Sequence, residues 1–138
     1  MKILSDFPYL KLVLIAIFAM HSIPSIYSGD VNGFGKMYLD TKGFAPFGIY
    51  LAWFIKLSHV GLIISIVMNR FVKILGWITI GILVGGIIMV HWPDGWFVVG
   101  GGRNGIEFNV LLIACLLTLM YPEWQFFKTN QKKSIYLN

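Results

Sequence analysis

Residues 45–68, APFGIYLAWFIKLSHVGLIISIVM, form the apolar run that decides the fold. As a helix, these roughly 24 residues rise about 1.5 Å each and cross the roughly 30 Å hydrocarbon core of a membrane. Lys56 lies roughly 16 Å into the run, and His59 follows it on the same helix face. A lysine at that depth costs about 3 kcal/mol to insert. We therefore expect the other helices to offer Lys56 polar partners.

Three further apolar runs accompany this one, at about residues 9–27, 73–91 and 105–121. With 57% hydrophobic and only 12% charged residues, the chain is more apolar than a soluble domain, in which about a quarter of residues are charged. The pattern predicts an all-α fold, a four-transmembrane-helix bundle that forms one membrane domain over residues 1–138. We expect the first run to be an uncleaved helix, since no small-x-small cleavage site of a secretory signal follows it.

The placement of basic residues predicts the orientation of the chain. Both termini are expected in the cytoplasm, because more basic residues flank that side of the four runs than the other. The formal net charge of +5 does not indicate a nucleic-acid partner, since the basic residues lie beside the ends of apolar runs and not in one stripe. The cytoplasmic set is Lys2, Lys11, Arg70, Lys73, Lys128, Lys132 and Lys133, and the outer set is Lys36, Lys42 and Arg103.

One connection and one apolar run carry further local signals. In the first outer loop, Phe34, Met37 and Tyr38 stand at helical spacing and predict a short interfacial helix, with an irregular loop as the alternative. In the third run, Gly81 and Gly85 form a GxxxG pair, a spacing that lets helices approach closely.

The predicted topology gathers the intramembrane polar groups in the outer half of the bundle. Polar side chains in a membrane face the bundle interior or a wet cavity, so we expect one outward-facing polar pocket, covered by residues 92–104. Simpler roles are open: Glu107 can cap its helix with Asn104, the histidines can bond loop carbonyls or headgroups, and Lys56 can form a structural ion pair with Glu107. The predicted ligand-binding residues are His21, Lys56, His59, His91, Arg103 and Glu107.

The motifs of common enzyme classes are missing from the sequence. It contains no Walker loop, no HExxH motif and no thiol pair, and its one cysteine, Cys115, lies in an apolar run. The three histidines lie at different depths, which disfavours both a bis-histidine haem and a zinc site. We assign no catalytic residue and no metal ligand.

Several stretches resemble the DoxX family of small four-helix membrane proteins. AMHSIPSIYSGD around His21 is similar to the family's first-helix HG-x-x-K pattern, and HWPDGWFVVGGGRNGIEFN matches a third-helix histidine, an aromatic loop and a G-x-E helix start. The entry to the second helix, residues 43–47, is also similar. Ser22, Ser25 and Lys56 depart from the family, which usually has glycine, often lysine and frequently glutamate there. The resemblance implies a bacterial inner-membrane protein, with associations to quinone-linked oxidation and redox-stress complexes.

These patterns support three hypotheses about function. The first is an accessory subunit that binds membrane or periplasmic protein partners, or a small ligand, through the polar pocket, with no cofactor of its own. The second is a quinone-linked oxidoreductase component, in which Lys56, His59 or His91 would bond the quinone carbonyls and Glu107 would exchange protons. The third is a small-molecule transporter, disfavoured because no half of the chain repeats the other.

Overall fold

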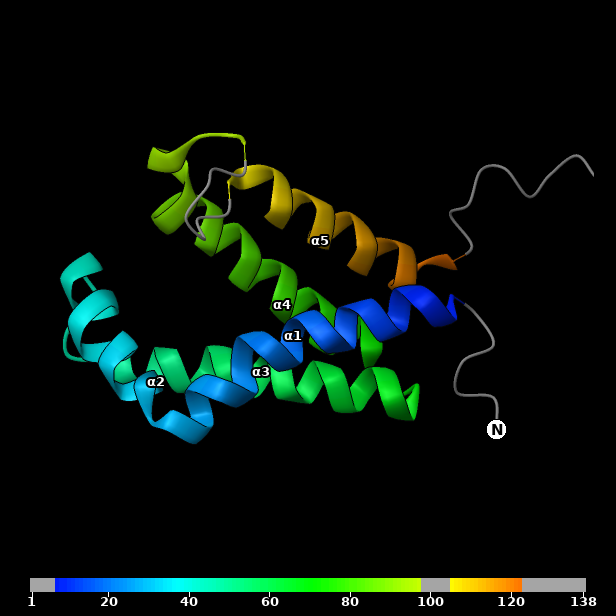
Figure 1. Ribbon diagram of the computed structural model, residues 1–138, viewed down its shortest axis with the longest axis horizontal. Coiled ribbons are helices and arrows are strands. Elements are labelled where there is room, and N and C mark those ends of the chain that lie inside the picture. Colours follow the sequence, from blue (N-terminus) through cyan, green and yellow to red (C-terminus); the bar gives the residue numbers. More distant parts are fainter. Residues whose placement is uncertain (1–6, 98–104, 123–138) are drawn as a thin grey trace, which may run out of the picture.

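In the computed structural model, residues 7–97 and 105–122 are described, and within these ranges every regular element is a helix. Each long helix packs against the next along the chain, and α5 also touches α1 (Figure 1). The predicted all-α fold is therefore confirmed. The four long helices are α1 (Pro8–Ser28), α3 (Gly48–Met68), α4 (Val72–Gly86) and α5 (Ile106–Met120).

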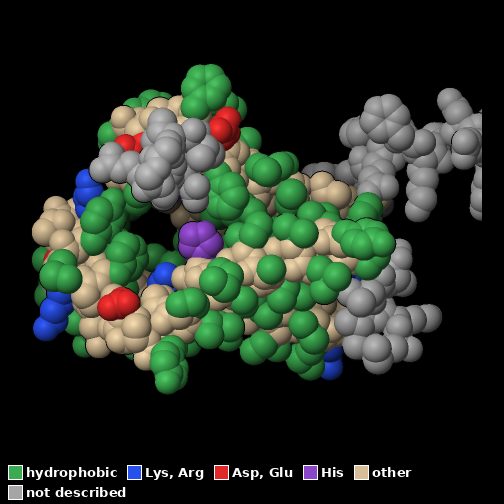
Figure 2. Space-filling model, in the orientation of Figure 1, with side chains coloured by type: hydrophobic (Ala, Val, Ile, Leu, Met, Phe, Trp, Pro, Cys, Tyr) green, Lys and Arg blue, Asp and Glu red, His purple; other side chains and the backbone are tan. Residues whose placement is uncertain are grey.

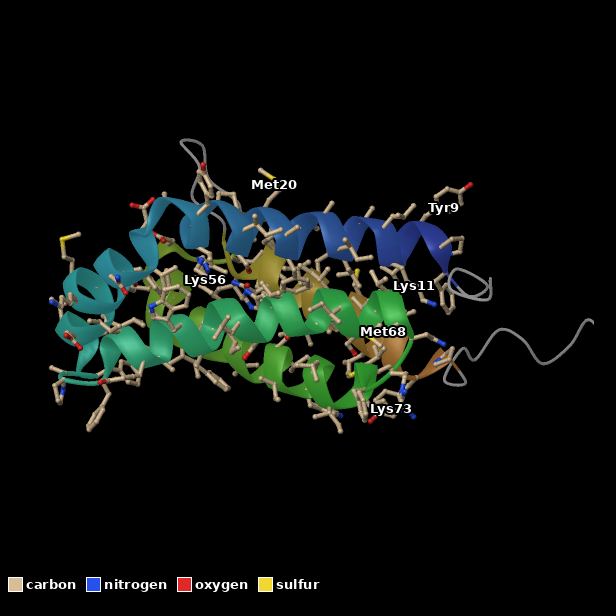
Figure 3. The ribbon with its side chains drawn as sticks, turned by 90° about the horizontal axis from the view of Figure 1, so that it is seen from below. Tyr9, Lys11, Met20, Lys56, Met68 and Lys73 are labelled. Atoms are coloured by element: carbon tan, nitrogen blue, oxygen red, sulfur yellow. The ribbon has the colours of Figure 1, made fainter. Side chains whose placement is uncertain are left out.

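Three helices are long and apolar enough to cross a membrane. They are α1, α3 and α4 with its continuation as far as Asp94, of 21, 21 and 23 residues. Helix α5 has 15 residues and rises only about 22 Å, so it is shorter than the predicted span 105–121 and shorter than the roughly 30 Å hydrocarbon core. The outward face of α1 is apolar, with Tyr9 82% and Met20 72% exposed (Figure 3). The lengths of these three helices and the exposed apolar face of α1 together indicate a membrane protein.

All four long helices contribute to one apolar core. The terminal end of the bundle holds Phe7, the α3–α4 connection and Tyr121, whereas the opposite end, the loop end, holds the first loop and the start of α5. The core runs between these two ends. Its buried members are Leu14, Phe18, Leu62, Ile66, Ile80, Leu83, Leu112, Leu116 and Met120.

The first loop is helical, as predicted, and it packs against α3 through residues other than the three whose spacing predicted the helix. It contains α2 (Asp30–Gly33), a π-helical turn η1 (Phe34–Leu39) and a 3-10 turn η2 (Asp40–Lys42). Val31, Gly35 and Leu39 are buried, whereas Met37 is 77% exposed. A Cβ on Gly35 would overlap the backbone at Gly48 and Ile49 of α3, so the absence of a side chain at Gly35 permits the contact.

Oxygen atoms of the loops accept hydrogen bonds from backbone N–H groups in the first turns of α3 and α5. The Asp40 carboxylate accepts the N–H of Gly48 at 2.9 Å, at the first turn of α3. At α5, the N–H groups of Ile106 and Glu107 donate to the carbonyls of Gly95 and Trp96 at 3.1 and 3.0 Å. These carbonyls satisfy donors that the sequence assigned to a side-chain cap. Asn104, the predicted capping residue, lies outside the described residues.

Within this chain, the close approach between α4 and α5 occurs at a glycine other than the predicted pair. A Cβ on Gly76 would overlap the Met120 side chain of α5. A Cβ on Gly81 or Gly85, by contrast, would have no atom of another described segment within 4 Å. The GxxxG pair therefore does not hold two helices of this bundle together.

Candidate functional site

Three histidines that are far apart in the sequence line one small cavity near the loop end. This histidine cavity has a volume of about 100 Å³. Helix α1 contributes His21, α3 contributes His59, and the continuation of α4 contributes His91. Figure 2 shows the surface hollowed at this end, with a histidine and a basic side chain visible in the hollow. The complete lining is Phe18, His21, His59, Leu83, His91, Phe108, Asn109 and Leu112.

His59 is the most deeply buried of the three histidines. Its residue is 8% exposed, and its ring lies 5.0 Å from that of Phe18, centroid to centroid, at an angle of 49°. Phe18 belongs to α1 and is itself buried in the core. The aromatic contact therefore ties the imidazole to the α1–α3 interface and fixes its position in the wall of the cavity.

His91 reaches the cavity because α4 changes its helical type. Helix α4 continues as a π-helical turn, η3 (Ile87–His91), whose hydrogen bonds span one extra residue. In an unbroken α-helix, the His91 side chain would stand about 80° away from that of Leu83, since each residue turns the helix by about 100°. The π turn accommodates one extra residue, so His91 follows Leu83 by the equivalent of seven α-helical positions. The side chains of Leu83 and His91 then point in directions about 20° apart. Both residues line the cavity.

The structure adds Asn109 to the polar lining, a residue that the sequence pattern did not single out. Asn109 belongs to α5, is 6% exposed and lies beside the histidines in the cavity wall. An amide within an apolar membrane helix is itself a signal for a polar partner or a wet cavity. In the sequence, a charge distinguishes Glu107, two positions earlier, whereas the neutral amide of Asn109 gives a weaker signal.

Four buried polar atoms in this cavity wall have no hydrogen-bond partner among the described residues. They are Nδ1 and Nε2 of His59, Nδ1 of His91 and Nδ2 of Asn109. A buried polar group left without a partner costs about 1–3 kcal/mol, so native proteins rarely keep several of them together. An imidazole and an amide offer both donors and acceptors, so the cavity can bind a ligand that carries either kind of group.

Lys56 lies beside the cavity, between α1 and α3 (Figure 3). Its ammonium donates to the backbone carbonyl of His21 at 2.6 Å and lies 6.0 Å from the ring centroid of Phe34. The partner that the structure gives Lys56 is therefore this backbone carbonyl, and not the Glu107 carboxylate that the sequence suggested.

The remaining two predicted residues are placed differently. Glu107 lies in the first turn of α5, where its backbone is held by Trp96 and where Phe108 and Asn109, which follow it, line the cavity. Arg103 lies outside the described residues. The structure thus brings three of the predicted side chains to one cavity, places Lys56 next to it, and leaves Glu107 at its edge.

An apolar groove lies on the other side of Lys56. It has a volume of about 530 Å³ and runs between η1, α3 and α4. Its wall includes Phe34, the ring nearest Lys56, together with Phe54 and Trp77. Gly81 and Gly85, whose α-carbons face open space, also line it. Lys56 thus contacts one lining residue of each, the His21 carbonyl beside the cavity and the Phe34 ring beside the groove.

The described residues contain no group of three histidine, cysteine, aspartate or glutamate side chains arranged to hold a metal ion. Comparisons with protein-family models, with curated proteins and with solved structures find no match to this chain. The resemblance to the DoxX family therefore remains a hypothesis.

Proposed function

We propose that this chain is a multi-pass membrane protein that binds a small oxygen-bearing ligand in the histidine cavity and acts as an accessory subunit. The observation that carries the proposal is the set of four unpartnered polar atoms of His59, His91 and Asn109. Keeping them buried is unfavourable unless something binds to them. A cavity near 100 Å³ has room for about three water molecules, so a small ligand would place only its polar edge there, in place of water.

The second candidate function is quinone binding, because a quinone carries both carbonyl oxygens and an apolar tail. Its carbonyl oxygens would accept hydrogen bonds from the Asn109 amide and from an imidazole N–H. Its apolar tail would lie in the groove beyond Lys56, which is lined by Phe34, Phe54 and Trp77. Ligand pockets combine an apolar wall with a few placed polar groups in this way.

The accessory role rests on the open face of α4. A Cβ at Gly81 or Gly85 would have no atom of another described segment within 4 Å, and both glycines line the apolar groove, so a partner helix would occupy it in place of a quinone tail. In membranes, where small residues allow backbones to approach, such a face suits a transmembrane helix of a partner subunit. We propose further that the terminal end faces the cytoplasm and the histidine cavity opens outward, in a bacterial inner membrane, because Lys11, Arg70 and Lys73 lie at the described terminal end and only Lys36 and Lys42 flank the helices at the described loop end.

A comparison of wild type with His59→Phe tests ligand binding. Phenylalanine keeps a ring at this position but removes both unpartnered nitrogens. We expect organic extracts of purified wild-type protein to contain an oxygen-bearing small molecule in near-equimolar amount, and extracts of His59→Phe to have lost it. The variant should be more stable than wild type from which the ligand has been removed, by about 1–3 kcal/mol. Mass spectrometry identifies the ligand, and the absorbance change on borohydride reduction shows whether it is a quinone.

Thr79→Val is the matched control. The Thr79 hydroxyl is also buried and without a partner among the described residues, but it does not line the histidine cavity. The substitution should raise stability without changing the extracted molecules. The proposal would be overturned if the extracts of wild type and His59→Phe contained the same molecules. It would also be overturned if the wild-type extract contained no such molecule.

A further inference from the structure

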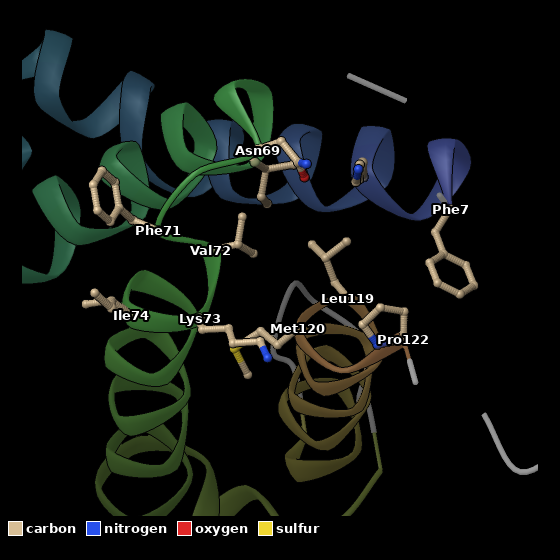
Figure 4. A pocket seen from close by; sticks show the side chains of 11 residues that line it. Phe7, Asn69, Phe71, Val72, Lys73, Ile74, Leu119, Met120 and Pro122 are labelled. Atoms are coloured by element: carbon tan, nitrogen blue, oxygen red, sulfur yellow. The ribbon is translucent and has the colours of Figure 1, made fainter. Parts of the chain in front are cut away.

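Two pockets with polar side chains in their walls lie near opposite ends of the described bundle, and they differ in whether those side chains already have partners. The larger pocket, of about 580 Å³, lies at the terminal end and includes Asn69 and Lys73 in its lining (Figure 4). Its two lysines, Lys11 and Lys73, already have interaction partners. No unpartnered buried polar atom of the described residues belongs to its lining. The histidine cavity has four such atoms, so its chemistry points to a ligand.

At least two of these four atoms are hydrogen-bond donors. The unpartnered atom of Asn109 is Nδ2, which donates and does not accept. Both nitrogens of His59 lack a partner among the described residues, and a neutral imidazole carries one N–H group, so His59 supplies a second donor. His91 Nδ1 can be a third, since either nitrogen of the ring can carry the proton. A ligand group with two acceptor atoms can therefore bind at least two of these donors.

Lys56 places a positive charge beside the cavity. Its ammonium donates to the backbone carbonyl of His21, whose side chain lines the cavity, and its other contact is the Phe34 ring at 6.0 Å. Neither a carbonyl nor a phenyl ring carries a net negative charge. Within the described part of the chain, Lys56 thus has no ion-pair partner.

Acidic side chains are missing from the described wall of the cavity. Asp94 and Glu107, which stand close to His91 and Asn109 in the sequence, lie outside the lining and already have interaction partners. Residues 98–104, outside the described ranges, contain no aspartate or glutamate in their sequence. The charge of Lys56 therefore favours a ligand that itself brings a negative charge.

The volume of the cavity limits the size of the anionic group. About 100 Å³ has room for about three water molecules, and hence for about three non-hydrogen atoms. A carboxylate group has this size, and its two oxygens only accept hydrogen bonds. Phosphate and sulfate groups are larger. A quinone carbonyl also accepts hydrogen bonds, but it is neutral and leaves Lys56 without a counter-ion.

We infer that the histidine cavity binds the carboxylate group of an organic acid, an inference that rests on the proposed function of this cavity. The carboxylate oxygens accept hydrogen bonds from the Asn109 amide and from an imidazole N–H of His59, and Lys56 attracts the anion through its charge. The hydrocarbon part of the acid leaves the cavity through the hollow at the loop end (Figure 2). Short water-soluble acids and membrane fatty acids share this carboxylate chemistry.

Thermal unfolding of the purified full chain in neutral detergent tests the preference for a carboxylate, because a ligand of the folded state raises the unfolding temperature according to its affinity. The probes are propanoate and palmitate, each compared with its neutral amide. Acid and amide have the same chain and nearly the same head-group size, so the difference between them reports the charge. We expect each acid to bind about tenfold more tightly than its amide. Much tighter binding of palmitate would identify a membrane fatty acid as the ligand, and similar affinities of the two acids a soluble one.

Variants at position 56 separate charge from structure. Lys56→Gln removes the charge and keeps a donor for the His21 carbonyl, so it should lower the affinity for acids about tenfold and leave that for amides unchanged. Lys56→Arg keeps the charge and should retain the preference for acids. The matched control, Lys36→Gln, removes the same charge from an exposed position at the loop end and should bind all probes as wild type does.

Different results would overturn this inference and the proposed function. Equal stabilisation of wild type by acid and amide, lost for both in His59→Phe, would show a site for neutral ligands and overturn only the inference. An unchanged acid affinity in Lys56→Gln would do the same. If neither acid stabilises wild type more than His59→Phe, the inference is wrong, and the proposed function is wrong as well if wild-type extracts contain no oxygen-bearing molecule.

Discussion

At the scale of single residues, Lys56 shows how a membrane helix accommodates a charge. Insertion of a lysine near the membrane centre costs about 3 kcal/mol, and a hydrogen bond to a charged group returns about 1.5–3 kcal/mol. The carbonyl of His21 supplies that bond at 2.6 Å. The two contributions nearly offset each other, so Lys56 is tolerated without a carboxylate partner.

The nature of the group at position 56 should therefore matter more than its size. Glutamine keeps a donor for the His21 carbonyl, whereas glutamate presents a second acceptor to it. We expect Lys56→Gln to unfold within about 1 kcal/mol of wild type and Lys56→Glu to lose about 3 kcal/mol or more. Thermal unfolding in detergent, followed by helical circular dichroism, measures both.

Leu57→Gln and Leu57→Glu provide the reference pair for this prediction. Leu57 is the next residue and its side chain is exposed. The pair therefore measures how much glutamine and glutamate differ in their effect on stability at a position away from the His21 carbonyl. The gap between glutamine and glutamate should be larger at position 56. Equal gaps at both positions would show that the bond to α1 contributes nothing to stability.

At the scale of elements, glycines divide into those that hold two segments together and those that face open space. Gly48 of α3 lies against the Gly35 carbonyl and the Asp40 carboxylate, where a Cβ has no room. Gly81 of α4 has open space around its α-carbon. The same substitution should therefore have opposite effects at the two positions.

We expect Gly48→Ala to destabilise the protein by about 1–3 kcal/mol, because the η1 segment must move away from α3. Gly81→Ala should stabilise the isolated chain by up to about 1 kcal/mol, since alanine favours the helix and contacts nothing here. Thermal unfolding of the two purified variants measures both changes. A loss of stability in Gly81→Ala would contradict the open face.

The bulkier Gly81→Leu extends this comparison to native membranes. If the open face of α4 binds a partner helix, leucine should prevent the close approach and reduce crosslinking between the chains. Crosslinking that is unchanged in Gly81→Leu would place the partner on another face.

At the scale of the whole molecule, charge separates the two ends of the bundle. Lys11, Arg70 and Lys73 lie at the terminal end, whereas the described acidic residues lie at the loop end. Basic residues are retained on the cytoplasmic side of membranes. In the proposed orientation, the histidine cavity opens toward the outside.

Cysteine labelling tests this orientation. In a Cys115→Ala background, Lys36→Cys and Arg70→Cys place one thiol on either side of α3, at exposed positions. A membrane-impermeant maleimide added to intact cells should label position 36 and not position 70, and lysis should expose position 70. The reverse pattern would invert the orientation, and labelling of both positions in intact cells would mean that α3 does not cross the membrane.

The sequence by itself determined the helices, because long apolar runs can satisfy their backbone polar groups in a membrane only by internal hydrogen bonds. It also indicated that His21, His59 and His91 belong to one end of the bundle, since alternating helix directions set the depth of each residue. Gly76 and Gly81 show the limit of such reasoning: both are glycines in the same run, and only the position of α5 makes one of them a contact.

Only the tertiary structure decided which side chains face one another. The π turn that directs His91, the position of Asn109 beside His59, and the inward orientation of Lys11 depend on how each helix is rotated about its axis. In a chain whose helices are apolar on all sides, hydrophobic periodicity does not specify that rotation, because lipid and protein core are equally apolar. Contacts between helices set it, and these join residues far apart in the sequence.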